Sequence, residues 1–399
     1  MQKPSKFRPV QEVSSQQPNY IQADGVSNLK WQSSEMFTQQ KLSEVSKQKP
    51  QKVISRGIGI FVKNKHSVVE TQTLYFTDLN SGKCGFIQLL YSSVMKGLYQ
   101  TFQLNFKICC SDDDKKELDT WESFKLDGIE LFTDLKLQSK NVTFEFKEST
   151  SAGTTLSIVS TLSTAGESRL LHINLHVKLG MSIQIGPDGC SYFSNKPSKT
   201  PQESKKRLRH VFVPQAICDG TLKYIKNGQL TEIHLQGVPS ILIGALHTLN
   251  PIKAACRWNF AVIQTQNNCG ICMEYTTPPD FGSVTVTISI FGSRNESPTV
   301  YASSVPTNKH VTFLATANDA KNKWDYPTAI RMPLGHTNFL VEDRLRMVNK
   351  YDILSELPRI VKSTVENIAG LKPCIYQYCQ RTRLADEDGI AIIESTFIT

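Results

Sequence analysis

The sequence predicts an all-β protein made of two units of antiparallel strands, either barrels or sandwiches. Three observations predict this class. Short segments of alternating apolar and polar residues recur, turn residues separate them, and the same rhythm restarts after a basic stretch at 196–210. With 399 residues, the chain has room for two or three domains that can each bury a core.

The first run of strands begins near Val68. Asn80-Ser81-Gly82 separates apolar segments at 71–79 and 84–91 and predicts a hairpin, because Asn and Gly tolerate positive φ. Residues 98–108 alternate in the same way. The strands predicted after them are 129–137, 142–148, 157–162, 170–179, 182–185 and 190–193.

The second run of strands opens with Asn227-Gly228, the strongest short-range hairpin signal in the chain. Farther on, Val284 to Phe291 alternates apolar with hydroxyl residues, which predicts a half-buried strand. One amphipathic helix is expected at 353–370, ended by Gly370 and Pro373 and packed on a sheet.

Charge and composition divide the chain into segments. The net charge is +9, and residues 1–66 hold eleven Lys or Arg against four Asp or Glu in a background of Ser, Gln and Pro. This composition predicts a mostly flexible basic arm. Residues 196–210 carry a net +5 and are expected to be a basic linker. The predicted organisation is arm 1–66, first unit 67–195, linker 196–210 and second unit 211–399.

The rest of the chain has a net charge of −3, so the positive charge belongs to the arm and linker. A nucleic-acid domain would carry its cations on a folded face, and nucleic acid is therefore not expected as a partner. The sequence has neither an apolar run of about 18 residues nor a signal-peptide core, which favours a cytoplasmic protein with reduced cysteines. The run Lys205 to Arg209 leaves a nuclear pool or peripheral membrane association as further options.

Motifs for catalysis or metal binding are scarce. Cys269-Gly270-Ile271-Cys272 has zinc or redox spacing, but no matching second pair exists, and structural cysteines are the favoured interpretation. His172 and His176 lie on a predicted strand, which puts them about 13 Å apart and favours a polar barrel face. No catalytic residue, metal or cofactor is predicted.

Aromatic residues on two adjacent strands form the candidate ligand site. Trp258, Phe260 and Val262 share one face of a strand, and Met273 and Tyr275 share a face of the next. Such a face lines a ligand cavity or fills a solid core with the same residue types, and the pattern alone favours the core.

Several segments resemble the fungal survival-factor family. They occur in family order from Asn28 to the C-terminus and are specific together. The segments are Asn28-Leu29-Lys30-Trp31, Val69 to Phe76, Gly189 to Phe193, Arg209 to Pro214, Trp258-Asn259-Phe260, Met273 to Ser283, Gly370 to Tyr378 and Ser395 to Ile398.

This resemblance implies two lipocalin-like β-barrels in tandem and a non-enzymatic carrier of a hydrophobic lipid. The family's themes are ceramide or other sphingolipid binding and the oxidative stress response, and they favour the cavity interpretation of the Trp258 strand. Pro4, Pro9 and Pro18 leave no amphipathic N-terminal helix, which fits a diverged paralogue. The arm and linker are expected to contact anionic membranes weakly. The alternative is a stress-related scaffold with side-chain-filled barrels that binds a protein partner.

Overall fold

The computed structural model describes residues 4–36, 67–94, 99–112, 119–151, 153–164, 169–249, 251–294, 296–306, 309–352 and 373–398. Within them the protein is all-β, as predicted. The helices among these described residues are short, and none of them is long and apolar enough to span a membrane. They are η1 (Gln32–Met36), η5 (Pro201–Ser204), α2 (Pro251–Ala254) and η6 (Pro279–Phe281). The helix predicted at 353–370 lies outside the described residues.

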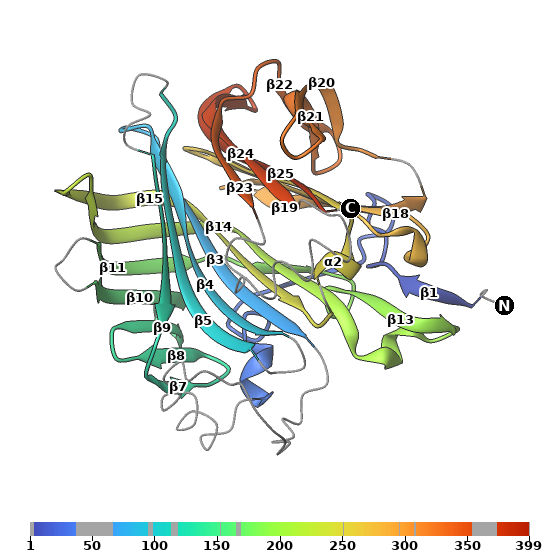
Figure 1. Cartoon of the computed structure of the whole chain (residues 1–399), viewed down its shortest axis with the longest axis horizontal. Helices are drawn as coiled ribbons and strands as arrows, with labels where there is room; N and C mark the ends of the chain where they lie inside the picture. Colours follow the sequence, from blue (N-terminus) through green and yellow to red (C-terminus); the bar gives the residue numbers. More distant parts are fainter. Residues whose placement is uncertain are drawn as a thin grey trace.

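A large antiparallel sheet of fifteen strands forms a nearly closed barrel (Figure 1). Its main path runs β6-β5-β4-β3-β15-β14-β11-β10-β9-β8-β7, so the two end strands follow each other in the chain. These strands are β3 (Val68–Asp78), β4 (Lys83–Val94), β5 (Tyr99–Cys110), β6 (Thr120–Leu126), β7 (Ile129–Phe132), β8 (Lys136–Ser139), β9 (Val142–Ser149), β10 (Gly153–Ser163), β11 (Leu170–Leu179), β14 (Lys206–Lys226) and β15 (Gln229–His247).

Both predicted hairpins are present. Asn227 and Gly228 join β14 to β15 with φ values of 50° and 76°, as a two-residue type I′ turn requires. The turn that contains Gly82 joins β3 to β4, with Asp78 paired to Lys83. Turn chemistry therefore fixes the register of four neighbouring barrel strands.

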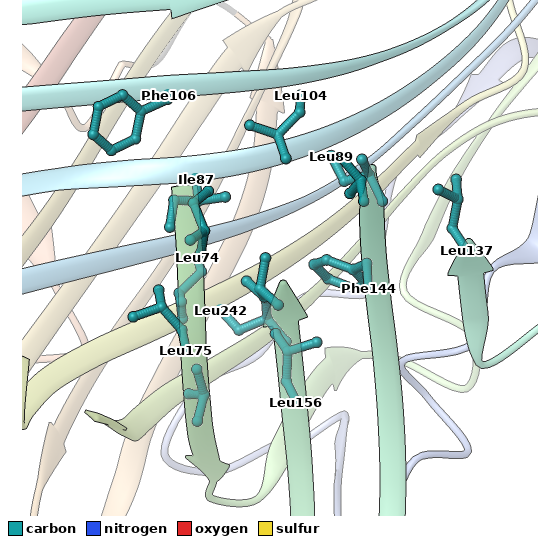
Figure 2. Packing of buried hydrophobic residues seen from close by; sticks show 14 of the residues in the cluster. Leu74, Ile87, Leu89, Leu104, Phe106, Leu137, Phe144, Leu156, Leu175 and Leu242 are labelled. Atoms are coloured by element: carbon teal, nitrogen blue, oxygen red, sulfur yellow. The ribbon is translucent and has the colours of Figure 1, made fainter. Parts of the chain in front are cut away.

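The inner face of the barrel is apolar (Figure 2). On β11, for example, Ile173 and Leu175 are buried while His172 and His176 lie on the outer face, which confirms the polar-face interpretation of the two histidines. One end of the lumen is filled by aromatic side chains. Trp31 is 5.5 Å from Phe132, measured between ring centroids, and further contacts of 4.9–5.9 Å involve Tyr91, Phe102 and Phe144.

The second unit consists of a seven-stranded sheet, β19-β18-β17-β16-β25-β24-β23, and a three-stranded sheet, β20-β21-β22 (Figure 1). The described strands therefore form one nearly closed barrel and a second, open sheet, whereas the sequence suggested two barrels. The strands are β16 (Arg257–Thr265), β17 (Asn268–Thr276), β18 (Val284–Ser293), β19 (Glu296–Pro306), β20 (Thr312–Asp319), β21 (Trp324–Leu334), β22 (Asn338–Glu342), β23 (Met347–Asp352), β24 (Cys374–Leu384) and β25 (Glu387–Phe397).

Strands β14 and β15 belong to the first sheet, although the sequence placed 211–399 in the second unit. β14 pairs with β11, and β15 pairs with β3, so this hairpin joins the two halves of the barrel wall, β3–β6 and β7–β11. A strand pattern reports burial on each face, but it does not report which sheet the strand joins. The strand pattern that restarts after residue 210 therefore does not mark the boundary between the two units.

The N-terminal arm is not flexible over the described residues 4–36. β1 (Ser5–Arg8) pairs with β13 (Cys190–Ser198), and β2 (Tyr20–Ala23) pairs with β12 (Ser182–Ile185). Polar composition suggested disorder, but a few apolar side chains anchor this segment against the folded body. The buried anchors are Phe7, Val10, Val13, Val26, Leu29 and Trp31.

The basic stretch 196–210 is also more ordered than a linker. Lys206 to His210 form the start of β14 and pair with β13 and β15. Arg209 donates hydrogen bonds to the backbone carbonyls of Asn28, at 2.9 Å, and Asp188, at 3.1 Å. The Arg209 side chain thus attaches the N-terminal segment to the barrel, a role that the sequence alone did not indicate.

Candidate functional site

The five residues predicted as a ligand site lie on one face of the second sheet. β16 presents Trp258, Phe260 and Val262 on this face, and register pairing places Tyr275 beside Trp258 and Met273 beside Phe260. All five belong to or pack on a single hydrophobic cluster. The structure therefore brings the predicted residues together; their role in ligand binding remains a prediction.

This face packs on the outside of the first barrel. Phe260 lies 5.6 Å from Tyr75 of β3, and Tyr75 lies 5.5 Å from Phe86 of β4, measured between ring centroids. The opposite face of β16, with Ala261 and Ile263, packs in a separate cluster with the three-stranded sheet. The candidate site is thus at the junction between the two units, and the described strands of the second unit do not enclose it.

Burial varies across the junction face. Val262, Met273 and Tyr275 are buried, whereas Trp258 and Phe260 are only half-buried. The half-buried aromatic surface continues onto the barrel, where Trp121 of β6 contacts Phe86 and also Tyr351 of β23, each at 5.6 Å between centroids. Rings from both units thus leave part of their surface uncovered at the junction.

A largely buried polar trio, Lys107, Gln377 and Glu394, adjoins these rings; Lys107 and Gln377 are buried and Glu394 is half-buried. Lys107 of β5 is only 3% exposed and donates from Nζ to Oε1 of Gln377 on β24. Gln377 in turn donates from Nε2 to Oε1 of Glu394 on β25, at 2.6 Å. Burial raises the pKa of Glu394, although the Gln377 hydrogen bond and the Lys107 charge act in the opposite direction.

Sheet register explains why the trio meets the aromatic face. Glu394 is the cross-strand partner of both Gln377 and Phe260, so the three side chains share one row of the second sheet. Lys107 occupies the facing row of the barrel, between its cross-strand partners Phe86 and Trp121. Sequence reasoning missed the trio because Lys107 occupies the polar phase of the alternating segment 98–108 and no strand was predicted at Gln377 or Glu394.

Two histidines stand at the Trp258 end of the junction. His247 of β15 stacks on Trp258 at 5.7 Å with an interplanar angle of 11°, and His210 of β14 lies 5.7 Å from His247. Burial lowers the pKa of His247 to about 4 and that of His210 well below its usual value. Within the described part of the chain, Nε2 of His247 is buried and has no hydrogen-bond partner.

Tyr275 connects the junction to the N-terminal segment. Its hydroxyl donates to Oγ of Ser191 on β13 at 2.6 Å, and the same Oγ accepts the backbone N–H of Val10 at 3.0 Å. Phe193, two residues farther along β13, makes an edge contact with Phe281 at 5.0 Å. Six of the eight segments that carry the family resemblance therefore meet at this junction, through Tyr75, Ser191, His210, Trp258, Tyr275 and Gln377.

A cavity of about 510 Å³ opens at the other end of the same strands. It forms where β14 bulges between Val213 and Ala216, beside the β16–β17 turn. Its lining is rich in amides, and the size falls in the range of ligand sites. Lining residues include Lys178, Gln215, Gln264, Asn268, Cys269 and Arg294.

The Cys269-Gly270-Ile271-Cys272 motif is not arranged as a single metal or redox site. The described residues contain no group of three or more His, Cys, Asp or Glu arranged to hold a metal ion. Cys269 and Cys272 lie on β17 and point to opposite faces, one into the junction cluster and one into the cluster behind it. Burial raises the pKa of Cys269 to about 12, as expected of a structural thiol.

Fold and site together define an all-β protein of two units whose junction combines aromatic surface with buried polar groups. Such a junction suits an amphipathic ligand. The chain belongs to the Svf1 family, whose sequence model matches residues 1–399. This confirms the resemblance to the fungal survival factors.

Two relatives illustrate the family. An SVF1-like protein of Saccharomyces cerevisiae, itself named uncharacterized, is 40% identical over 416 residues, which cover 99% of this chain and 98% of the relative. A protein of Candida albicans named ceramide-binding protein SVF1 is 28% identical over 352 residues, covering 83% of this chain and 85% of the relative.

A solved structure shares the fold. The crystal structure of a Nitrosomonas europaea protein assigned as an AttH has a TM-score of 0.51 and 11% sequence identity, covering 84% of this chain and 93% of that one. At this identity the likeness shows the fold alone.

Proposed function

We propose that this protein is a non-enzymatic lipid carrier that holds ceramide or a related sphingolipid at the junction between its two units. The observation that carries the proposal is the half-buried aromatic surface of Trp258, Phe260 and Trp121 beside the largely buried polar trio. The ceramide-binding name of the Candida albicans relative supports the same ligand class.

The chemistry of the site matches that of a ceramide. Such a lipid has two long hydrocarbon chains, which gain about 0.8 kcal/mol for each methylene removed from water. Its head carries an amide and hydroxyl groups. The ammonium of Lys107 can donate to the amide carbonyl, and the carboxylate of Glu394 can accept from an N–H or O–H.

The filled end of the first barrel favours one alternative. Trp31 and its aromatic neighbours occupy that part of the lumen with side chains. A barrel filled along its whole length would act as a stress-related scaffold that presents its surface to a protein partner. Cargo analysis separates the two functions, because a scaffold has no lipid cargo.

The same proposal places the protein in the cytoplasm, with a role in the oxidative stress response. The positive charge of the chain, +9 overall, would give weak contact with anionic membrane surfaces, at about 1 kcal/mol for each cation near the surface. Such contact would bring the junction near its lipid source without anchoring the protein.

The test combines lipid analysis of the purified native protein with a ceramide transfer assay. We expect stoichiometric co-purified lipid, and we expect Phe260→Glu to weaken ceramide binding by about tenfold or more, because it places a charge against the lipid chains. Phe339→Glu, at an aromatic residue exposed on β22, is the matched control and should bind normally. Absence of both co-purified lipid and ceramide transfer would refute the carrier function.

A further inference from the structure

Three thiols meet at one edge of the junction. Cys84 on β4 and Cys109 on β5 are cross-strand partners on the outside of the barrel, and Cys379 on β24 belongs to the second sheet. All three are buried. The Sγ atoms of Cys84 and Cys379 are 3.1 Å apart, although 295 positions separate the two residues in sequence.

Polar contacts hold the two units together around these thiols. Arg381, two residues after Cys379, donates from Nε to Oδ1 of Asp112 at 2.7 Å. Arg346 donates from Nε to the backbone carbonyl of Cys379 at 2.9 Å, and its Nη1 lies 3.8 Å from Oδ2 of Asp119 in the first unit. A disulfide bond is about 2.05 Å long, so an approach of about 1 Å would bring the two sulfur atoms to bonding distance.

We propose that Cys84 and Cys379 form a reversible disulfide, with a hydroperoxide as the oxidant, that links the first barrel covalently to the second sheet. In the first step one thiol loses its proton and the thiolate attacks the peroxide, so the O–O bond breaks; with hydrogen peroxide, a sulfenic acid forms, and the leaving hydroxide takes up the released proton to give one molecule of water. In the second step the other thiolate attacks the sulfenic sulfur, the S–S bond forms, and hydroxide leaves and is protonated to a second water. A thiol reductant restores both cysteines.

The surroundings of Cys84 determine which step is slow. Contact with Cys379 lowers the pKa of Cys84, but burial together with the nearby Cys109 and Asp119 raises it overall, so the thiolate is scarce and the attack on peroxide is slow. The second step is fast because the resolving thiol already lies in contact. The expected product is therefore the disulfide, since the sulfenic acid is consumed before a second peroxide can oxidise it further.

The experiment treats the full-length reduced protein with hydrogen peroxide until the half-buried Cys256 thiol has reacted, which serves as an internal clock. Free thiols are then alkylated, the protein is digested without reductant, and linked peptides are identified by mass spectrometry. Thermal unfolding is recorded before oxidation, after it, and after reduction with dithiothreitol. Cys84→Ala and Cys379→Ala test the pair, and Cys218→Ala, a buried thiol inside the barrel wall, is the matched control.

We expect a Cys84–Cys379 linked peptide and a melting temperature that rises by several degrees on oxidation and returns on reduction. Both effects should persist in Cys218→Ala and disappear in either pair variant. If a pair variant does not fold, the peptide map of the unsubstituted protein decides alone. Free Cys84 and Cys379 after Cys256 has reacted, or linkage of Cys84 to Cys109 instead, would overturn the proposal.

Discussion

Glu70 attaches the N-terminal segment to the first barrel through a buried carboxylate. It accepts the backbone N–H groups of Gln32 at 2.8 Å and Ser33 at 2.7 Å, and also the hydroxyl of Ser33. Gln72, on the same strand, donates to the backbone carbonyl of Leu29 at 3.0 Å. Two segments that carried the family resemblance, one on each side of residues 37–66, are therefore joined by direct hydrogen bonds.

We expect Glu70→Ala to lower the free energy of unfolding by about 2 kcal/mol, because it leaves two buried N–H groups without an acceptor. Glu70→Gln keeps one acceptor oxygen and should lose about half as much. Urea unfolding followed by circular dichroism measures both changes. Glu232→Ala, which breaks an exposed ion pair with Lys223, is the control and should change stability by less than about 1 kcal/mol. Equal losses in all three variants would contradict this role of Glu70.

β18 shows that a strand with alternating apolar and hydroxyl residues can be buried on both faces. Val286, Ile288 and Ile290 are buried on one face as the sequence predicted, and this face lies at the junction, but Thr287 and Ser289 on the other face are buried as well. Thr287 donates to the buried carboxylate of Glu274 at 3.0 Å, and Ser289 donates to the backbone carbonyl of Gly335 at 3.1 Å. The hydroxyl face therefore packs against protein, so the half-buried assignment was wrong.

The N-terminal strands give a prediction at the scale of elements. Deleting residues 1–23 removes β1, β2 and the buried side chains of Phe7, Val10 and Val13, and should cost about 5 kcal/mol or more of stability. Deleting residues 1–4 leaves both strands intact and should be nearly neutral. Soluble yield and urea unfolding of the two truncated proteins provide the measurement. A stable 1–23 deletion would instead support the flexible arm that composition suggested.

Local signals predicted the strands and hairpins well because turn chemistry and alternation act between near neighbours. Asn227-Gly228 and the Trp258 face are examples, and the five candidate residues did assemble on one surface. The sequence could not show that this surface faces another sheet. That arrangement depends on the barrel, which is built by pairings such as β15 with β3 between residues more than 160 positions apart. The sequence did not identify Lys107 and Glu394 as site residues for the same reason, because each charged side chain is expected in solvent until the strand that faces it is known.

At the scale of the whole molecule, the histidine pair lies where the two units meet. His210 and His247 come from the barrel strands β14 and β15, and both pack against Trp258 of the second sheet. Their low pKa values mean that the folded protein keeps both rings neutral below the pH at which an unfolded chain protonates them. Acid should therefore weaken this junction.

We expect stability to fall as the pH drops from about 6.5 toward 4, because the unfolded state then binds protons that the folded state excludes. Each histidine contributes a slope of up to about 1.4 kcal/mol per pH unit in that range. Comparing melting temperatures of the unsubstituted protein and His247→Gln at pH 7 and pH 5 isolates the effect, since other titrating groups are common to both. The variant should lose less stability between the two pH values; an identical loss would contradict the assignment.

The attachment of residues 4–36 also has a consequence for biosynthesis. Val13 bridges to Ala302, the backbone N–H of Val10 binds Ser191, and Trp31 packs against Phe132 and Phe144. Translation runs from the N-terminus, so Val13 is synthesised 289 residues before its partner Ala302, whereas Phe132 follows Trp31 by only 101 residues. The part of the segment around Val13 must therefore wait, with its apolar side chain exposed, until Ala302 has been made. During that interval the nascent chain is most open to chaperones and to aggregation.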